Sequence, residues 1–450
     1  MSGTKVGPAI SIVEAQDDAL DRSDARLEAL GYRPEFRREM NLFAVVGMSF
    51  TAIGILTGMS SAFQTGLFAG GPLGLFWGWN ICALFMFLVA LCLAEICSAY
   101  PTMGGLYYWV SKMKSDKPIL GYVTGVLYAC AMIFTGTSGN LSTALYIASM
   151  AEVGTGITLS RVEITGMAWC VCLLSAIINS WGSRGIGMVS QVNVWWTLVG
   201  TIILVVTLLV KSPVKNSALF VFTDLENFTG WGNNGFVVLL GFLQAVYTLE
   251  GAETSAQVAE EARNAEWLAP IGIAASIVGS WFIEHIVCHP DRPTGHASSW
   301  RLAPWVGVWL SATIAIIISA AYIGSVVAFN AILSSAAIAV MLSYLQPILC
   351  RVLWPESMEV RGPFHLGKYS RAINAISALF TVFVCVLFIL PTSMPVDALN
   401  MNYSIVAIGA VLILILSSWV FYGQYHFKGP VSTVDMPPLT EDGDEDKKTS

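Results

Sequence analysis

The chain has 450 residues, of which 55 % are hydrophobic and only 12 % are charged, with a formal net charge of −7. A soluble domain normally carries about a quarter charged residues, so this composition excludes an ordinary water-soluble protein. The acidic excess comes largely from the two tails, and we expect no nucleic-acid partner.

Long segments contain no Asp, Glu, Lys or Arg, for example those between Glu39 and Glu95 and between Arg301 and Arg351. A helix that crosses a bilayer needs roughly 20 apolar residues, and these segments do not alternate as barrel strands do. The sequence therefore predicts an all-α, polytopic protein embedded in the lipid bilayer, with about eleven crossings. The predicted crossings cover residues 42–66, 73–99, 119–149, 164–181, 188–210, 235–254, 268–288, 306–323, 326–350, 372–391 and 402–422.

Basic residues in short loops indicate which ends of the crossings face the cytosol. Three arginines precede the first crossing and three lysines follow the second, which places the N-terminus in the cytosol. We expect a multi-pass protein, in the plasma membrane by family preference, with a cytosolic tail over 1–39. The transmembrane domain is expected over 40–427 and a second cytosolic tail over 428–450.

The alternation of inner and outer loops fails around residues 281–305, as if one crossing were missing. Three histidines and a cysteine gather in this stretch: His285, Cys288, His289 and His296. One interpretation is a metal site, but the spacing fits no standard zinc pattern. We favour a stretch of foreign composition left by a deletion or an untranslated segment, and we predict no metal site.

Two predicted outer ends carry the Asn-x-Ser/Thr pattern of N-glycosylation. They are Asn227-Phe228-Thr229 and Asn402-Tyr403-Ser404. Such short patterns also arise by chance, so glycosylation at Asn227 and Asn402 is an expectation only.

Two crossings are interrupted by small and polar residues. The first contains Gly54 and Gly58, and the sixth contains Glu250 and Gly251. Paired interruptions in two halves of a membrane protein are typical of transporters, because unwound backbone near the midplane can bind substrate. Free N–H groups suit a carboxylate, and free C=O groups suit an ammonium. The alternative is close packing of helices through small residues.

Glu250 is a carboxylate deep within a predicted crossing, where a charge costs roughly 3 kcal/mol or more. It would face a polar cavity as the partner of a substrate cation, as a proton carrier, or as a cap for a helix end. Alternatively the crossing ends early and Glu250 lies at the cytosolic interface, where we expect Glu253. Tyr128, Phe242 and Tyr247 are candidates for cation–π contact with an amine.

The segment 95–107 reads EICSAYPTMGGLY and resembles the signature after the second helix of the amino acid–polyamine–organocation superfamily. The chain is most similar to the fungal amino acid/choline transporter branch, which includes GABA and choline permeases. The resemblance covers 31–281 and 308–430. It implies a five-plus-five inverted repeat with two extra C-terminal helices, and secondary active transport of amino acids or small amines coupled to a proton or another ion.

The resemblance also implies roles for single residues. The backbone of the first interruption would bind the substrate's polar ends, through Ala52, Ile53, Gly54, Ile55 and Leu56. The opposite wall would be formed by Tyr247, Thr248, Leu249, Glu250 and Gly251. Gating residues would be Glu95, Glu260, Glu261 and Arg263. No nucleophile–base set or nucleotide-binding loop stands out, so the sequence predicts no enzyme and no cofactor.

The chain departs from the family after Trp281, where the sequence predicts that the eighth helix is absent. This helix would line the site as the repeat partner of the third. Two alternatives to a working carrier therefore remain, a transport-inactive truncated permease and a nutrient-sensing receptor on a transporter fold.

Overall fold

The computed structural model describes residues 23–34, 38, 40–180, several between 192 and 211, 218–283, 305–325, 327–358, 360–397 and 401–430. These residues form helices and turns, with two isolated β-bridges and no longer strand. Nine helices among them are long and apolar enough to cross a membrane. The predicted all-α, polytopic architecture is confirmed.

The helices of the first half follow the predicted crossings closely. They are α2 (Leu42–Ile53), α3 (Ile55–Phe68), α4 (Gly71–Ala99), α5 (Gly105–Met113), α6 (Pro118–Thr155) and α7 (Arg161–Ser180). The crossing predicted over 188–210 lies mostly outside the described residues, and the described ones between 192 and 211 are helical.

The second half contains shorter pieces. They are α9 (Ala218–Thr223), α10 (Asn234–Leu240), α11 (Phe242–Thr248), α12 (Thr254–Gln257), α13 (Ala265–Ile283), α14 (Trp305–Ser319), α15 (Ala321–Gly324), α16 (Val327–Leu353), α17 (Ser370–Leu387), α18 (Ser404–Ser418) and α19 (Gln424–His426). Residues 284–304, with the histidines and Cys288 of the atypical stretch, lie outside the described residues, as do 1–22 and 431–450.

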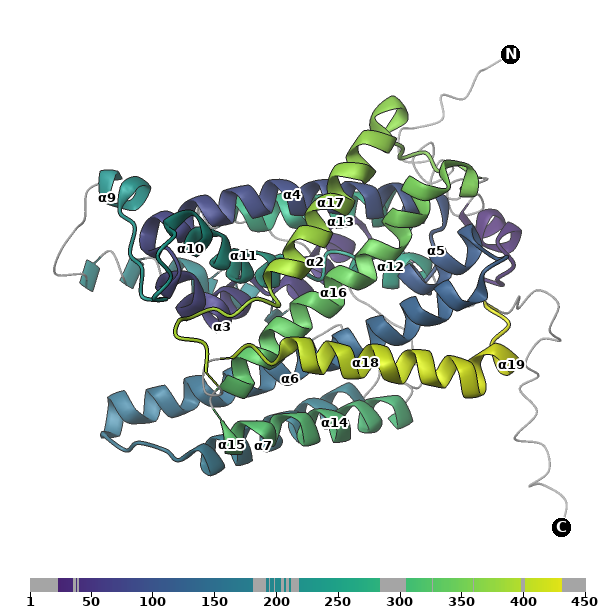
Figure 1. The fold of residues 1–450 in the computed structure, drawn as a ribbon. Helices are drawn as coiled ribbons and strands as arrows, with labels where there is room; N and C mark the ends of the chain where they lie inside the picture. The colour runs from purple at the N-terminus through teal and green to yellow at the C-terminus, as the bar shows by residue number, and fades with distance from the viewer. Residues whose placement is uncertain are drawn as a thin grey trace, which may run out of the picture.

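Two helices form the centre of the bundle. α16 runs diagonally through it, and it contacts α6 on one side and α17 on the other (Figure 1). α4 packs against α13 and α17. In the most apolar 18-residue segment of α4, and likewise in that of α16, 67 % is buried inside the protein. The corresponding share in the C-terminal helix is 17 %. α4 and α16 are therefore inner helices, whereas α18 presents most of its surface to lipid.

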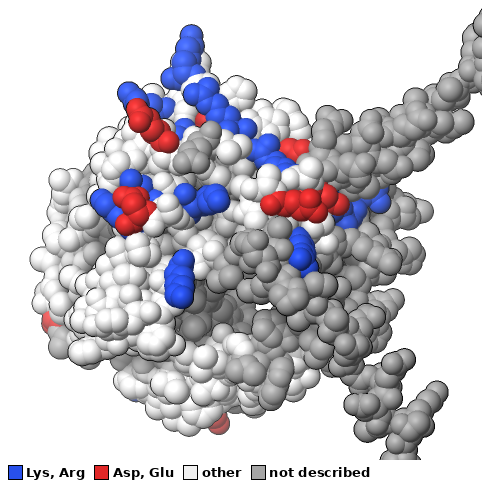
Figure 2. Space-filling model, turned by 90° about the vertical axis from the view of Figure 1, so that its right-hand side faces the viewer, with Lys and Arg blue, Asp and Glu red and all other residues white. Residues whose placement is uncertain are grey.

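Charged side chains gather at one end of the molecule, which we call the charged end. Figure 2 shows Lys and Arg side chains, with some Asp and Glu, on this face. The loops and helix ends there include Lys112, Lys114, Lys117, Arg263, Arg351, Arg361 and Lys368. The uncharged turn between α3 and α4, residues 69–70, lies at the opposite end.

Glu95 fastens three elements at the charged end. Its side chain is 3 % exposed, and its carboxylate accepts hydrogen bonds from Leu366 N at 3.1 Å and Ser370 Oγ at 2.5 Å. Arg351 Nη2 lies 3.8 Å from the same carboxylate. The contacts join α4 to α16 and to the start of α17.

Replacing this carboxylate is expected to destabilise the bundle. Glu95→Gln leaves Arg351, whose side chain is 12 % exposed, without its counter-charge, which should lower the free energy of unfolding by about 3 kcal/mol. Thermal unfolding in detergent measures the change, with Glu152→Gln on the exposed end of α6 as the matched control. Equal melting temperatures for both variants would show that Glu95 does not hold these helices together.

Candidate functional site

The first crossing is broken at one residue. Gly54 has a φ of 54° and separates α2 from α3, as the sequence predicted. The first N–H groups of a helix have no partner within that helix, and Gly54 has no side chain to cap them. The beginning of α3, at Ile55 and Leu56, therefore presents backbone N–H groups inside the bundle.

The sixth crossing is broken over a longer stretch. α11 ends at Thr248 and α12 begins at Thr254, with Gly251 at a φ of 102° between them. A Cβ atom on Gly251 would lie 3.1–3.3 Å from atoms of Ala52. A Cβ on Gly58 would lie 3.2 Å from Thr248 Cα. The two breaks are thus in direct contact.

Hydrogen bonds from serines also join the two breaks. Ser49 Oγ on α2 donates to the carbonyl of Ala252 at 2.6 Å and accepts from the N–H of Ser255 at 2.8 Å. Ser255 Oγ donates to the carbonyl of Val45 at 3.2 Å. These bonds supply partners for backbone groups that the interrupted sixth helix leaves free.

Glu250 lies within the second break and is 6 % exposed. Neither of its carboxylate oxygens has a hydrogen-bond partner among the described residues. The carboxylate of Glu250 interacts electrostatically with three nearby side chains, those of Tyr247, Tyr344 and Cys385. A buried carboxylate without donors is costly, so this position favours a bound cation or a proton.

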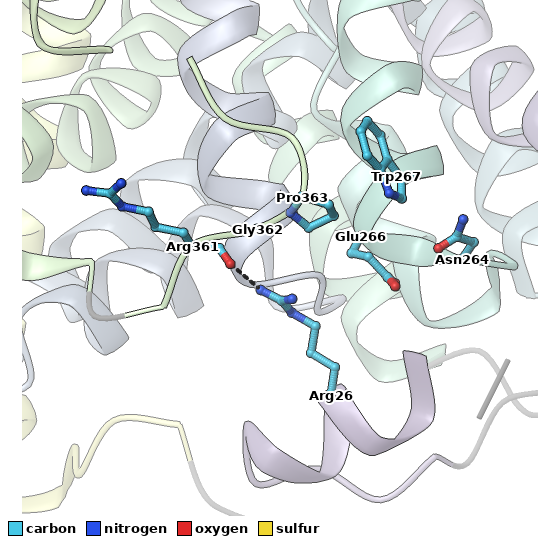
Figure 3. A pocket seen from close by; sticks show the side chains of 7 residues that line it. All are labelled: Arg26, Asn264, Glu266, Trp267, Arg361, Gly362 and Pro363. Atoms are coloured by element: carbon cyan, nitrogen blue, oxygen red, sulfur yellow. Dashed lines mark hydrogen bonds between the residues drawn. The ribbon is translucent and has the colours of Figure 1, made fainter. Parts of the chain in front are cut away.

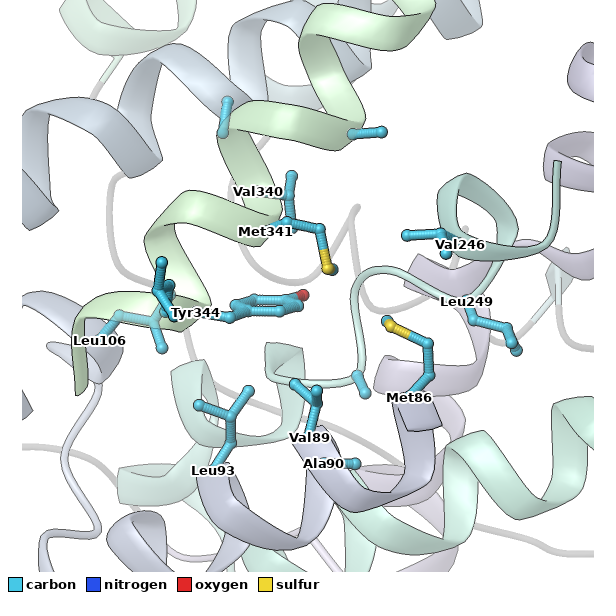
Figure 4. Close-up of a cluster of buried hydrophobic side chains, with 14 of the residues drawn as sticks. Met86, Val89, Ala90, Leu93, Leu106, Val246, Leu249, Val340, Met341 and Tyr344 are labelled. Atoms are coloured by element: carbon cyan, nitrogen blue, oxygen red, sulfur yellow. The ribbon is translucent and has the colours of Figure 1, made fainter. Parts of the chain in front are cut away.

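Glu253 is not at a water-exposed interface, where the sequence placed it. It is 2 % exposed, and its oxygens accept hydrogen bonds from Tyr128 of α6, at 2.7 Å, and from Tyr344 of α16. The expectation was wrong because Glu253 lies between α6 and α16, whose tyrosine hydroxyls take the place of water as its hydrogen-bond partners. The ring of Tyr344 points from α16 toward this break, among Met341, Leu249 and other apolar side chains (Figure 4).

The three candidate aromatic residues take different positions. Tyr247 Oη is 2.8 Å from Ser138 Oγ on α6, and Tyr128 binds Glu253. Phe242 is 4 % exposed and packs against Gly78 of α4. Only the two tyrosines are thus hydrogen-bonded around the breaks.

The predicted gating residues lie at the charged end. Glu260 Oε1 accepts from the N–H of Met103 at 3.0 Å, and the carbonyl of Glu261 accepts from the N–H of Met40 at 3.0 Å. Arg263 Nε donates to the carbonyl of Arg38 at 3.3 Å. These contacts tie the segment after α12 to the start of α2 and to the loop after α4, whereas Glu95 binds the start of α17.

Arg38 makes a second set of contacts at the charged end. Its guanidinium pairs with Asp24 at 2.6 Å and donates to the carbonyls of Ala259 and Ala262. A surface cavity of about 430 Å³ lies beside this segment, and Arg26 reaches across it to the carbonyl of Arg361 (Figure 3). The N-terminal segment therefore covers part of the charged end.

Two small internal cavities, about 80 Å³ each, lie on either side of the breaks. One opens toward the end opposite the charged one, and its lining includes Thr65, Asn330 and Ser334. The other lies toward the charged end, and its lining includes Trp109 and Glu253. Glu253 of the second break thus lines the cavity toward the charged end.

The two glycosylation patterns are both folded into turns. Asn227 Nδ2 donates to the carbonyl of Trp231 at 2.7 Å. Asn402 is 9 % exposed, and its Nδ2 donates to the carbonyls of Phe388 and Leu390. Glycosylation at either asparagine stays a prediction, and at Asn402 a glycan would replace these bonds.

Comparison with known proteins identifies the family to which this chain belongs. A family model described as amino acid permease matches residues 40–288 and 295–412. The chain belongs to this family of amino acid permeases. It is a multi-pass membrane transporter for amino acids and not an enzyme.

Relatives from plants and fungi share most of the chain. The permease is 30 % identical to the amino-acid permease BAT1 homolog of Oryza sativa subsp. japonica, over 92 % of this chain and 96 % of that one. It is 28 % identical to amino-acid permease BAT1 of Arabidopsis thaliana (92 % and 97 %) and 24 % identical to amino-acid permease 2 of Neurospora crassa (92 % and 90 %). Both plant alignments run over 502 positions, more than the 450 residues of this chain, so the relatives contain residues that this permease lacks.

A solved structure is also similar. The crystal structure of the Eremococcus coleocola manganese transporter with an aromatic bis-isothiourea substituted compound has 12 % sequence identity and a TM-score of 0.46. The match covers 86 % of this chain and 96 % of that one. The predicted five-plus-five repeat stays a prediction.

Sequence reasoning missed several residues of the site. Ser138 and Tyr344 lie within long apolar helices, and Ser255 lies beyond the second break. A polar residue in an apolar crossing is the available signal, but many such residues bond only to their own helix, as Thr135 and Thr143 do. The partners across helices are visible only in the structure.

Gly251 is expected to tolerate no side chain. Gly251→Ala puts a Cβ against Ala52 at a left-handed φ, which should destabilise the protein by about 1–3 kcal/mol and abolish transport. Thermal unfolding and uptake measure the two effects. Gly139→Ala on α6, where a Cβ meets nothing within 4 Å, is the control and should keep both properties. Unimpaired Gly251→Ala would disprove the close contact between the breaks.

Proposed function

We propose that this permease is a secondary active transporter whose substrate binds at the contact between the two breaks. The observation that carries the proposal is the contact of Gly251 with Ala52 beside the carboxylate of Glu250, which has no hydrogen-bond partner in the described part of the chain. A site between two interrupted helices permits alternating access, because each half can rock against the other around the bound substrate.

The two ends of an amino acid match two different parts of the site. Its carboxylate would bind the N–H groups at the start of α3, where the helix dipole favours negative charge. Its ammonium would approach Glu250, with the ring of Tyr247 close by. GABA carries the same two charges farther apart. Choline has no carboxylate and no N–H, so it would use only Glu250 and the aromatic ring.

We propose the orientation that the basic loops favour. The charged end faces the cytosol, which places the N-terminus there. The plasma membrane is the location that the family resemblance favours. Glu260, Arg263 and Arg38 would then belong to the cytosolic gate, because they fasten the segment after α12 to the start of α2. Opening toward the cytosol would require these bonds to break.

A second candidate is a permease that binds substrate without moving it, as an inactive carrier or a receptor. The match to the family model is interrupted between residues 288 and 295, within the stretch where the charge pattern indicates a missing crossing.

Uptake distinguishes the two candidates. Cells without their own permeases should accumulate radiolabelled GABA, choline or amino acids from a mixed pool when they express the wild type. Glu250→Gln should abolish this uptake, because the neutral amide no longer attracts the substrate cation, and Glu152→Gln should not. No uptake by wild type that is present at the cell surface would favour the inactive carrier or receptor, and full uptake by Glu250→Gln would remove Glu250 from the site.

A further inference from the structure

Glu253 has a hydrogen-bond environment that differs from that of Glu250, three residues before it. Both oxygens of Glu253 face tyrosine hydroxyls, Oε1 that of Tyr128 and Oε2 that of Tyr344. A tyrosine hydroxyl has only one hydrogen to donate. The other partners of each hydroxyl therefore decide what Glu253 receives.

A hydrogen bond from a second residue, Gln257, directs the hydroxyl hydrogen of Tyr128 toward Glu253. Gln257 Nε2 donates to Tyr128 Oη at 2.6 Å. Because this oxygen already accepts a hydrogen bond there, its own hydrogen is available for Glu253 Oε1, 2.7 Å away. Tyr128 belongs to α6, so this bond fastens the second break to that helix.

The hydrogen of Tyr344 is directed in the same way. The backbone N–H of Gly251 donates to Tyr344 Oη at 3.1 Å. The hydroxyl hydrogen is then available for Glu253 Oε2. Tyr344 belongs to α16, so Glu253 joins the second break to both α6 and α16.

An ionised Glu253 satisfies this arrangement, because a carboxylate only accepts hydrogen bonds. Adding a proton turns one oxygen into a donor that faces another donor. One tyrosine contact must then rotate or break, which loosens the second break from α6 or α16. The binding or release of one proton at Glu253 thus changes the contacts that join the substrate site to α6 and α16.

Protons can approach Glu253 from one side. The cavity of about 80 Å³ toward the charged end is lined by Glu253 together with Tyr128, Gln257 and Trp109. The titratable groups that face Glu253 are Glu250 of its own crossing, Tyr128 of α6 and Tyr344 of α16. Tyr247 and Cys385 interact with Glu250 and not directly with Glu253. No arginine or lysine of the described residues pairs with Glu253, so its charge balance depends on protons.

We propose that Glu253 is the binding site of a coupling proton, and that this proton exchanges with water at the charged end. An O–H bond forms on the carboxylate as one tyrosine contact is given up, and the reverse step restores the contact and returns the proton to water. The inference rests on the proposed transport function. It assigns different roles to the two carboxylates: Glu250 binds the substrate and Glu253 binds the proton.

Purified permease in vesicles tests the proposal with a mixed pool of radiolabelled amino acids. One proton per substrate supports about tenfold accumulation for each pH unit of imposed gradient. Glu253→Gln should lose this accumulation and still exchange labelled for unlabelled amino acids at equal concentration inside and outside. Accumulation by Glu253→Gln equal to wild type would overturn the proposal. Absence of exchange in the wild type would instead overturn the transport function itself.

The tyrosines provide a test that does not depend on folding of the glutamine variant. Tyr128→Phe and Tyr344→Phe each remove one donor to Glu253, so the carboxylate is less stabilised and should take up its proton at higher pH. Infrared spectra of the protonated carboxyl group, recorded during a pH titration, should show this shift. Tyr146→Phe, which removes a hydroxyl of α6 that contacts Ser61, should not. Titration curves that coincide with the wild type would overturn the role of Glu253.

Discussion

Every backbone N–H and C=O group within a bilayer must have a hydrogen-bond partner, and the architecture of this permease depends on that constraint. Continuous helices satisfy it by themselves, whereas the breaks at Gly54 and at residues 249–253 do not. Ser49 and Ser255 bind across the first and sixth crossings, and Tyr344 binds the N–H of Gly251. The two breaks therefore occur as a pair, with the proposed substrate site at their contact.

Three buried carboxylates illustrate how local donors decide the role of a charge in a membrane protein. Glu95 has an arginine, a serine and a backbone N–H, and it joins helices. Glu253 has two tyrosine hydroxyls, which support its ionised form and connect it to two helices. Glu250 has no donor among the described residues, which suits a site that a cation occupies. Burial alone would not distinguish these three residues.

The stretch between α13 and α14 is where this permease departs from its relatives. The family match is interrupted between residues 288 and 295, and the plant relatives contain residues that this chain lacks. The described contacts between the breaks come from residues 45–58 and 248–255, so the proposed binding groups lie outside the interrupted stretch. Transport and substrate binding are therefore separate questions for this permease.

The sequence by itself determined the all-α membrane architecture, the approximate bounds of most described crossings, and the two interruptions at Gly54 and Gly251. These follow from local properties, namely the length of apolar runs and the positions of glycine and acidic residues. Only the tertiary structure decided that Glu253 is buried against Tyr128 and Tyr344, and that Phe242 packs against α4 instead of joining the tyrosines. Partners of this kind lie about a hundred residues apart, and no local pattern encodes which polar residues of different helices meet.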